Sequence, residues 1–237
     1  MLILGLLVMA LGLLIIGGCG LLHVIGSNEI MGQYSYVHTR DYTGPVNREI
    51  PIWISKDFGE ADQVEIARAV EQWNYVLNGF VHLTIVDTAF NMEIYKIKDS
   101  VVQGGWLIMK INSDNPIVPI PAKPGLWTLA FVDTIGGSHM YFIRDRLQNE
   151  DMFGVAMHEM GHLLGAPHVG RKLMYYKFSR FRYQCVDPAT AKAVAEHQGM
   201  APDDLNYCVD NDTMSFTQTP STSTDEVSNC PLEGDRP

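Results

Sequence analysis

His158-Glu-Met-Gly-His-Leu-Leu-Gly-Ala-Pro-His168 is the stretch that decides what the rest of the chain is expected to do. On a helix, His158 and His162 are four residues apart, so both imidazoles leave the same face one turn apart. That spacing lets two nitrogens reach one Zn²⁺ at about 2.0–2.1 Å. The stretch therefore predicts a helix that carries two metal ligands.

The remaining residues of the stretch complete a catalytic zinc site. Glu159 follows the first ligand and would act as the general base toward a zinc-bound water. Gly165 suits a left-handed turn that ends the helix, because glycine has no Cβ to clash. The reversal of the chain would bring back His168 as a third ligand. Three protein nitrogens leave a fourth position for water, which is typical of a catalytic zinc site rather than a structural one.

This pattern resembles the long zinc signature of the metzincin metalloproteases, which is followed by a methionine turn. Met174 lies six residues after His168 and resembles that methionine. Leu173-Met174-Tyr175 is most similar to the matrixin branch, although Tyr176 stands where matrixins usually have proline. Tyr176 also matches the offset of a tyrosine that lies near the zinc in the astacin and serralysin branches. The branch within the metzincins therefore stays open.

The resemblance implies roles for two residues beyond the ligands. Met174 would form an apolar floor beneath the metal without binding it. Tyr176 would stabilise the oxyanion of the reaction, or would only pack against its neighbours. The resemblance covers roughly residues 48–200 and is weak outside the motif.

The resemblance also implies a fold class, a mixed α+β zincin-like fold. Its parts are a twisted, mostly parallel sheet with an antiparallel edge strand, a long active-site helix, the Met-turn and a C-terminal helix. The sequence pattern supplies candidate elements. Strands are predicted at 50–54, 80–86, 90–97, 106–111, 126–132 and 139–144, and helices at 60–78, from about 150 to Gly165, and at 188–199. Trp73 lies on the apolar stripe of the first helix and is predicted to be core.

Trp127–Val132 is predicted to be the edge strand that lines the cleft, because Leu129-Ala130 resembles the corresponding residues of matrixins. The alternative is that it is simply another strand of the sheet. An extended peptide can add to such an edge through backbone hydrogen bonds. His139 resembles a histidine that helps hold a structural zinc in matrixins, but the companion His-x-Asp pattern is missing, so no second zinc is predicted. Ca²⁺ binding is possible but unsupported, because no acidic stretch has the signature of a calcium loop.

The amino-acid composition limits the classes of partner that the chain is expected to bind. The 237 residues have a formal net charge of −10, and no charged residue precedes Glu29. A nucleic-acid-binding surface would show a basic patch, so no nucleic acid is expected. We expect a monomer whose partner is a peptide or protein substrate.

Residues 1–26 are almost wholly apolar and predict a signal peptide, a lipoprotein signal or a membrane anchor. Ile16-Gly17-Gly18-Cys19 resembles a bacterial lipobox, in which Cys19 would be lipidated, although no basic residue precedes the run. The alternative is an uncleaved membrane helix. An extracytoplasmic protein, anchored in the membrane or secreted, is expected in either case. The other boundaries are a linker over 27–47, a catalytic domain over 48–208, and a disordered Ser/Thr-rich tail over 209–237.

Four cysteines are present: Cys19, Cys185, Cys208 and Cys230. Disulfides persist outside the cytoplasm. Cys185 and Cys208 bracket one predicted helix and are the favoured disulfide pair. Cys230 lies in the tail.

These observations predict a zinc-dependent endopeptidase that cleaves extracytoplasmic proteins. One alternative is a non-catalytic, zinc-containing surface lipoprotein or binding module. Glu159 argues against it, because a structural zinc site needs no carboxylate at that position. A second alternative is an exopeptidase or another metal-assisted hydrolase with the same motif.

Overall fold

The structure is a computed structural model of the chain. It describes residues 35–37, 41–91, 104–120, 126–148, 151–170, 172–178, 185–209 and 227–228. The chain divides after Ser35 into two units, and the account below concerns the second, Tyr36–Pro237. Cys19, Cys230 and the predicted signal segment 1–26 lie outside the described residues, as does most of the predicted strand 90–97.

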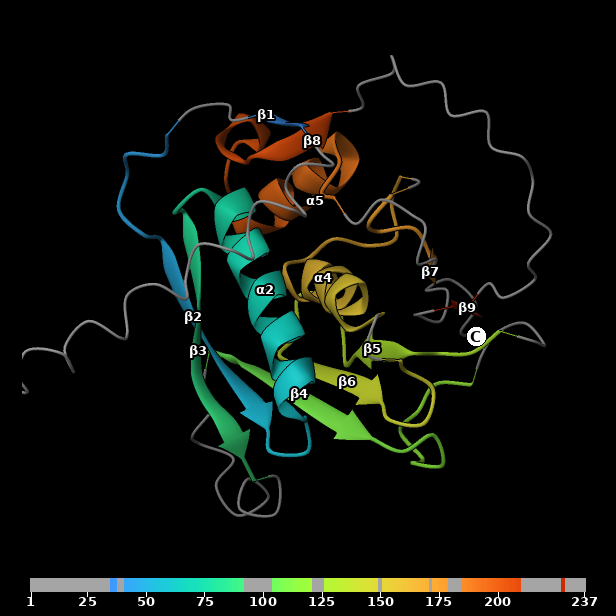
Figure 1. Cartoon of the computed structure of the whole chain (residues 1–237). Coiled ribbons are helices and arrows are strands. Elements are labelled where there is room, and N and C mark those ends of the chain that lie inside the picture. Colours follow the sequence, from blue (N-terminus) through green and yellow to red (C-terminus); the bar gives the residue numbers. More distant parts are fainter. Residues whose placement is uncertain are drawn as a thin grey trace, which may run out of the picture. The chain divides into compact units, whose positions relative to one another are not determined.

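A five-stranded sheet in the order β3-β2-β4-β6-β5 forms one layer of the fold (Figure 1). Its strands are β2 (Arg48–Ser55), β3 (Val81–Phe90), β4 (Trp106–Ile111), β5 (Ala130–Val132) and β6 (His139–Ile143). β2 runs parallel to β3 and β4, and β4 runs parallel to β6. β5 pairs antiparallel with β6 at the edge. The predicted fold class, mixed α+β with a mostly parallel sheet and an antiparallel edge strand, is confirmed.

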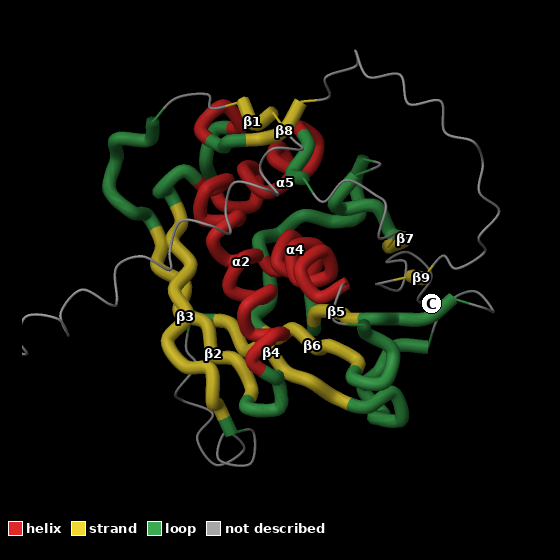
Figure 2. Tube along the Cα trace, viewed as in Figure 1, coloured by secondary structure: helices red, strands yellow, loops and turns green. Residues whose placement is uncertain are grey.

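The helices are α2 (Glu60–Leu77), α4 (Met152–Leu163) and α5 (Pro188–Gln198), and a 3-10 turn, η2, covers Pro202–Asp204. α2 and α4 lie on the same side of the sheet (Figure 2). α2 buries the predicted apolar stripe, in which Trp73 is fully buried and donates a hydrogen bond from Nε1 to the backbone oxygen of Met157, 3.0 Å away. This bond joins the two helices near the middle of the motif helix.

The predicted ends of α2 and α5 agree with the structure because they depend on local backbone chemistry. α2 stops at Asn78, which has a φ of 50° in the left-handed region. Asp187 caps α5, because its side chain accepts hydrogen bonds from the backbone nitrogens of Ala189 and Thr190, and Pro188 follows at the first helical position.

Several strands differ from their predicted extents. β3 continues to Phe90, four residues beyond the predicted end, because its pairing with β2 continues past the alternating apolar residues. β5 contains only the last three residues of the predicted strand. β1 (Ser35–Val37) lies in the predicted linker and pairs with β8 (Tyr207–Val209). β7 (Lys177–Phe178) pairs with β9 (Val227–Ser228), which lies in the segment predicted to be a disordered tail. Such short pairings use backbone groups and leave little trace in the side-chain pattern.

None of the helices in the described part of the chain is both long and apolar enough to span a membrane.

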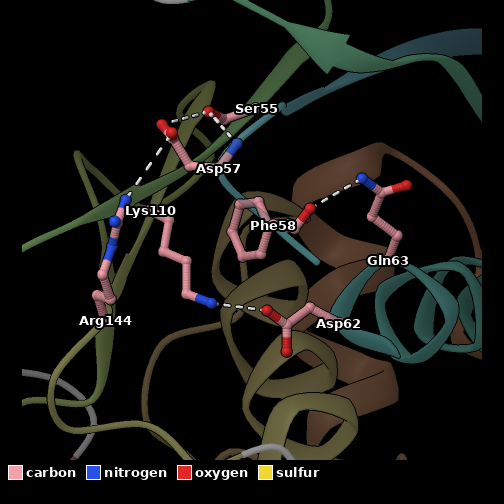
Figure 3. A network of polar contacts seen from close by, with 7 residues as sticks. All are labelled: Ser55, Asp57, Phe58, Asp62, Gln63, Lys110 and Arg144. Carbon is pink, nitrogen blue, oxygen red and sulfur yellow. Dashed lines mark hydrogen bonds and ion pairs between the residues drawn. The ribbon is translucent and has the colours of Figure 1, made fainter. Parts of the chain in front are cut away.

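A network of polar contacts joins the start of α2 to the carboxyl ends of the parallel strands (Figure 3). Lys110 at the end of β4 donates to Asp62 in the first turn of α2, with 2.6 Å between Nζ and Oδ2. Their side chains are 16% and 7% exposed, respectively. Asp57 accepts a hydrogen bond from Ser55 and lies 3.9 Å from a guanidinium nitrogen of Arg144. The network fixes α2 over the sheet.

We expect Asp62→Ala to lower the free energy of unfolding by about 2 kcal/mol, because it leaves the mostly buried ammonium of Lys110 without its carboxylate. Glu65→Ala is a matched control on the same helix, since the side chains of Glu65 and Arg68 are 28% and 31% exposed, respectively. Its loss should stay below about 1 kcal/mol. Urea unfolding followed by circular dichroism measures both. Equal losses in the two variants would show that the buried pair contributes no more to the free energy of unfolding than the more exposed pair does.

Candidate metal centre

The helix that carries the motif is buried on nearly every side. α4 packs between α2 and the strands β5 and β6, and its sequence is apolar or small apart from the residues of the motif. His158, Glu159 and His162 are only 1%, 0% and 2% exposed. Polar groups are rarely buried so completely without a partner or a function. The three side chains therefore form a polar cluster inside the core.

The end of α4 turns the chain toward the third histidine. Gly165 has a φ of 102°, a conformation in which a side chain is strained. The N–H of Ala166 donates to the carbonyl of Gly161, and the N–H of Gly165 donates to the carbonyl of His162. These two bonds are the Schellman pattern of a helix C-terminus. The glycine-based reversal predicted from the sequence is confirmed.

The reversal brings His168 back beside the helix. The ring centroids lie 4.8 Å apart for His158–His162, 5.4 Å for His158–His168 and 4.8 Å for His162–His168. One nitrogen from each of the three rings lies within 4.8 Å of the other two. The three histidines can therefore hold one metal ion, as the spacing predicted.

Backbone carbonyls orient the first two rings. Nδ1 of His158 donates to the carbonyl of Leu173 at 2.6 Å, and Nδ1 of His162 donates to the carbonyl of Ala166 at 2.7 Å. A neutral imidazole that donates from Nδ1 presents a lone pair at Nε2. Carbonyl partners of this kind are the usual support for metal-binding histidines, because they fix the ring and the tautomer.

The free nitrogens fit a metal ion. Nε2 of His162 and Nε2 of His168 are buried and have no hydrogen-bond partner among the described residues. Leaving such atoms without a partner costs free energy, and coordination of a cation would satisfy both. Three imidazoles without a thiolate suit Zn²⁺ better than the hard, oxygen-seeking Ca²⁺. The donor set thus supports zinc and gives calcium no support.

The electrostatics of the site keep the imidazoles neutral. Burial lowers the pKa of His162 to about 3, with a further contribution from neighbouring His168. Burial also lowers the pKa of His168 to about 4. The pKa of His158 lies well below its ordinary value, first because of burial and then because of the two other histidines. Near neutral pH all three rings keep the lone pairs that a metal needs.

These pKa values predict that the metal-free protein loses stability in mild acid. The unfolded chain binds protons near the ordinary histidine pKa of 6.5, whereas the folded chain resists them down to about 4. The free energy of unfolding should therefore be at its full value above pH 6.5 and fall below it. The slope is up to about 1.4 kcal/mol per pH unit for each histidine.

Urea unfolding of the metal-free protein at pH 7.5 and 5.5 tests this pH dependence. The His162→Ala variant serves as the comparison, because it removes one of the protonation sites and should show a smaller difference between the two pH values. A free energy of unfolding that stays equal at both pH values in the unaltered chain would contradict the prediction.

Met174 packs against Gly161, the residue before the second ligand. It is fully buried, and a Cβ placed on Gly161 would come within 2.5 Å of its sulfur and 3.1 Å of its terminal carbon. Gly161 thus allows the methionine to approach the helix one residue before the second ligand. Met174 occupies a turn in which the N–H of Tyr175 donates to the carbonyl of Lys172. The carbonyl of Leu173 in this turn is the one that holds His158, so the turn supports the site through its backbone as well.

The other predicted site residues lie as follows. Glu159 is fully buried on α4 between the two helical ligands in sequence. Tyr176 is half-buried, with its ring 4.6 Å from the ring of Tyr175 and 5.7 Å from Nζ of Lys177.

Cys185 and Cys208 form a disulfide with their Cα atoms 6.1 Å apart. His139 lies 3.2 Å from a carboxylate oxygen of Asp133, whose pKa is lowered by its hydrogen bonds to His139 and Thr134 despite partial burial.

Two features of the site were not predicted from the sequence. The carbonyls of Leu173 and Ala166 hold the imidazoles, and backbone groups leave no mark on the residue pattern. The N–H of Gly136, in the loop between β5 and β6, donates to the carbonyl of His162 at 2.8 Å. The adjacent glycines 136 and 137 gave no indication of this contact with the motif.

No protein-family model matches the chain, and no curated protein matches it. A solved structure does match: the crystal structure of metalloproteinase-II from Bacteroides fragilis. The two chains share 20% sequence identity with a TM-score of 0.45, over 73% of this chain. The match spans 59% of the length of that metalloproteinase. Any assignment of function must therefore be based on the residues of this chain and their geometry.

Proposed function

We propose that this chain is a zinc-dependent endopeptidase that hydrolyses peptide bonds of extracytoplasmic proteins. The observation that carries the proposal is the convergence of three neutral imidazoles, two buried and one partly buried, where the helix that supplies two of them also carries the fully buried Glu159. Two of the three have an Nε2 that is buried without a partner. His158, His162 and His168 would hold the zinc ion, and Glu159 would serve the reaction.

Zinc, when bound, supplies a Lewis acid and lowers the pKa of a coordinated water toward about 7. Glu159 would accept the proton of the attacking water and deliver it to the leaving amine. Its complete burial favours this task, because a carboxylate removed from bulk water interacts more strongly with the groups beside it. The carbonyls of Leu173 and Ala166 would hold the ligand rings in the required tautomer. Met174 would close the floor of the site without binding the metal.

The edge strand offers a place for the substrate. β5 pairs on one side with β6, is the last strand of the sheet, and contacts α4. An extended peptide could add to it through backbone hydrogen bonds. In this arrangement a segment of substrate would run past the motif helix. We infer that the substrate is an extended peptide or an unfolded stretch of a protein, with cleavage at an internal bond.

The finer parts of the proposal come from the sequence alone. They are membership of the matrixin branch of the metzincins, a role for Tyr176 in stabilising the oxyanion, and a monomeric protein held at the membrane by residues 1–26, with or without lipidation of Cys19. The disulfide between Cys185 and Cys208 suits a protein outside the cytoplasm.

The test is hydrolysis of a library of quenched fluorescent peptides, blocked at both ends, by the full chain. We expect cleavage that stops when phenanthroline removes the metal, continues with a phenanthroline isomer that cannot chelate, and returns when zinc is added. Blocked ends separate an endopeptidase from an exopeptidase. Bound zinc without any cleavage would favour the non-catalytic binding module instead.

A further inference from the structure

The last turn of α5 lies against the turn that carries the chain from the second histidine to the third. A Cβ placed on Gly165 would overlap the Cβ, Cγ and Cδ2 of His197. A Cβ placed on Gly136 would lie 2.6 Å from Cε1 and Nε2 of the same ring. The imidazole of His197 therefore covers two glycines that are far apart in the sequence, with no room for a side chain on either.

These two glycines share one hydrogen-bond acceptor. The N–H of Gly136 and the N–H of Gly165 both donate to the carbonyl of His162, at 2.8 and 3.0 Å. The ring of His197 thus lies over the two peptide groups that converge on the backbone of the second ligand. Displacing either glycine would move that carbonyl and, with it, the last turn of α4.

The neighbouring residue of α5 makes a second contact with the same turn. Nε2 of Gln198 donates to the carbonyl of Leu164 at 2.9 Å. Leu164 ends α4, and its carbonyl is one of those that a helix C-terminus leaves without an internal partner. Consecutive residues of α5 therefore hold consecutive residues of the turn, Leu164 and Gly165.

The third ligand depends on this turn more than the others do. The rings of His158 and His162 donate to carbonyls, whereas the ring of His168 makes no hydrogen bond to any residue that the structure describes. On the C-terminal side of His168, the N–H of Val169 donates to the carbonyl of Met174 at 3.0 Å and fixes the backbone. On the N-terminal side, the turn at residues 164–165 determines the position of the His168 backbone.

We propose that His197 and Gln198 are positioning residues for the metal site, which fix the turn 164–165 and through it place His168. Neither residue belongs to the motif, and His197 is itself exposed, so the sequence pattern alone does not link them to the metal site. The inference rests on the proposed zinc site. It assigns to α5 the role of positioning the third ligand of that site.

The test compares His197→Ala and Gln198→Glu with Glu196→Ala, an exposed change on the same turn of α5. Zinc affinity is measured by competition with a chromogenic chelator, and the visible spectrum is recorded for the cobalt-loaded proteins at saturation. We expect about a tenfold or larger loss of zinc affinity in the first two variants, the size found for outer partners of metal ligands. The cobalt spectrum should shift in both, and the control should match the unaltered chain.

Two further measurements separate positioning from folding. His197→Phe keeps a flat ring over the glycines and should retain zinc affinity to within about threefold. Circular dichroism of the metal-free variants establishes that they are folded when the cobalt spectra are taken. Unchanged affinity and an unchanged cobalt spectrum in both His197→Ala and Gln198→Glu would overturn the inference while leaving the zinc site intact. An unaltered chain that takes up neither metal would overturn the proposed function and this inference together.

Discussion

Glu159→Gln should abolish peptide hydrolysis while the protein still binds zinc. The amide has nearly the shape of the carboxylate, so the buried side chain keeps its place on α4, but it cannot accept the proton of water. Loss of a general base of this kind lowers kcat by about 10²–10⁴-fold. Zinc affinity should change little, because the three imidazoles remain.

The measurement is kcat/KM on a cleavable peptide together with zinc content by atomic emission. Glu71→Gln, an exposed change of the same type on α2, is the matched control and should keep full activity. Hydrolysis at the ordinary rate by the Glu159→Gln protein would refute the assigned base. Loss of zinc along with activity would show that the glutamate supports the metal site rather than the proton transfer.

Gly165→Ala should weaken both the fold and the metal site. The residue has a φ of 102°, which strains any side chain, and its Cβ would overlap the ring of His197. We expect a loss of at least about 3 kcal/mol in the free energy of unfolding, since the backbone strain alone costs about 1–2 kcal/mol. Zinc affinity should fall by tenfold or more, because the turn that places His168 must shift.

Gly199→Ala separates the two causes. Gly199 ends α5 with a φ of 73°, and a Cβ at that position would meet nothing within 4 Å. The control therefore has the backbone strain without the overlap, and should lose only about 1 kcal/mol with unchanged zinc affinity. Equal losses in the two variants, by urea unfolding and chelator competition, would contradict the close packing of α5 on the motif.

The sequence predicted those parts of the fold that depend on local chemistry. The apolar spacing around Trp73 located α2, the Asp187-Pro188 pair located the start of α5, and Gly165 located the reversal after the motif. The histidine cluster could be predicted as well, because the geometry of one helix turn and one reversal follows from spacing alone. The edge position of β5 came from resemblance, and the strand proved shorter than predicted.

The remaining features depend on how distant segments dock. β1 pairs with β8, and β9 pairs with β7, through backbone groups, although composition predicted a linker around β1 and a disordered tail around β9. The carbonyl partners of the ligands come from Leu173 and Ala166, whose side chains have no part in the contact. His197 meets Gly165 only because α5 packs against the end of α4. No periodicity along the chain encodes such contacts, because they are set by tertiary packing.

A crystal of the full chain, grown with zinc and recorded on both sides of the zinc absorption edge, tests the central claim most directly. We predict a single anomalous peak about 2.0–2.1 Å from Nε2 of each of His158, His162 and His168. Absence of a peak among the three rings, or a zinc ion bound elsewhere in the chain, would contradict the metal site and the peptidase proposed from it.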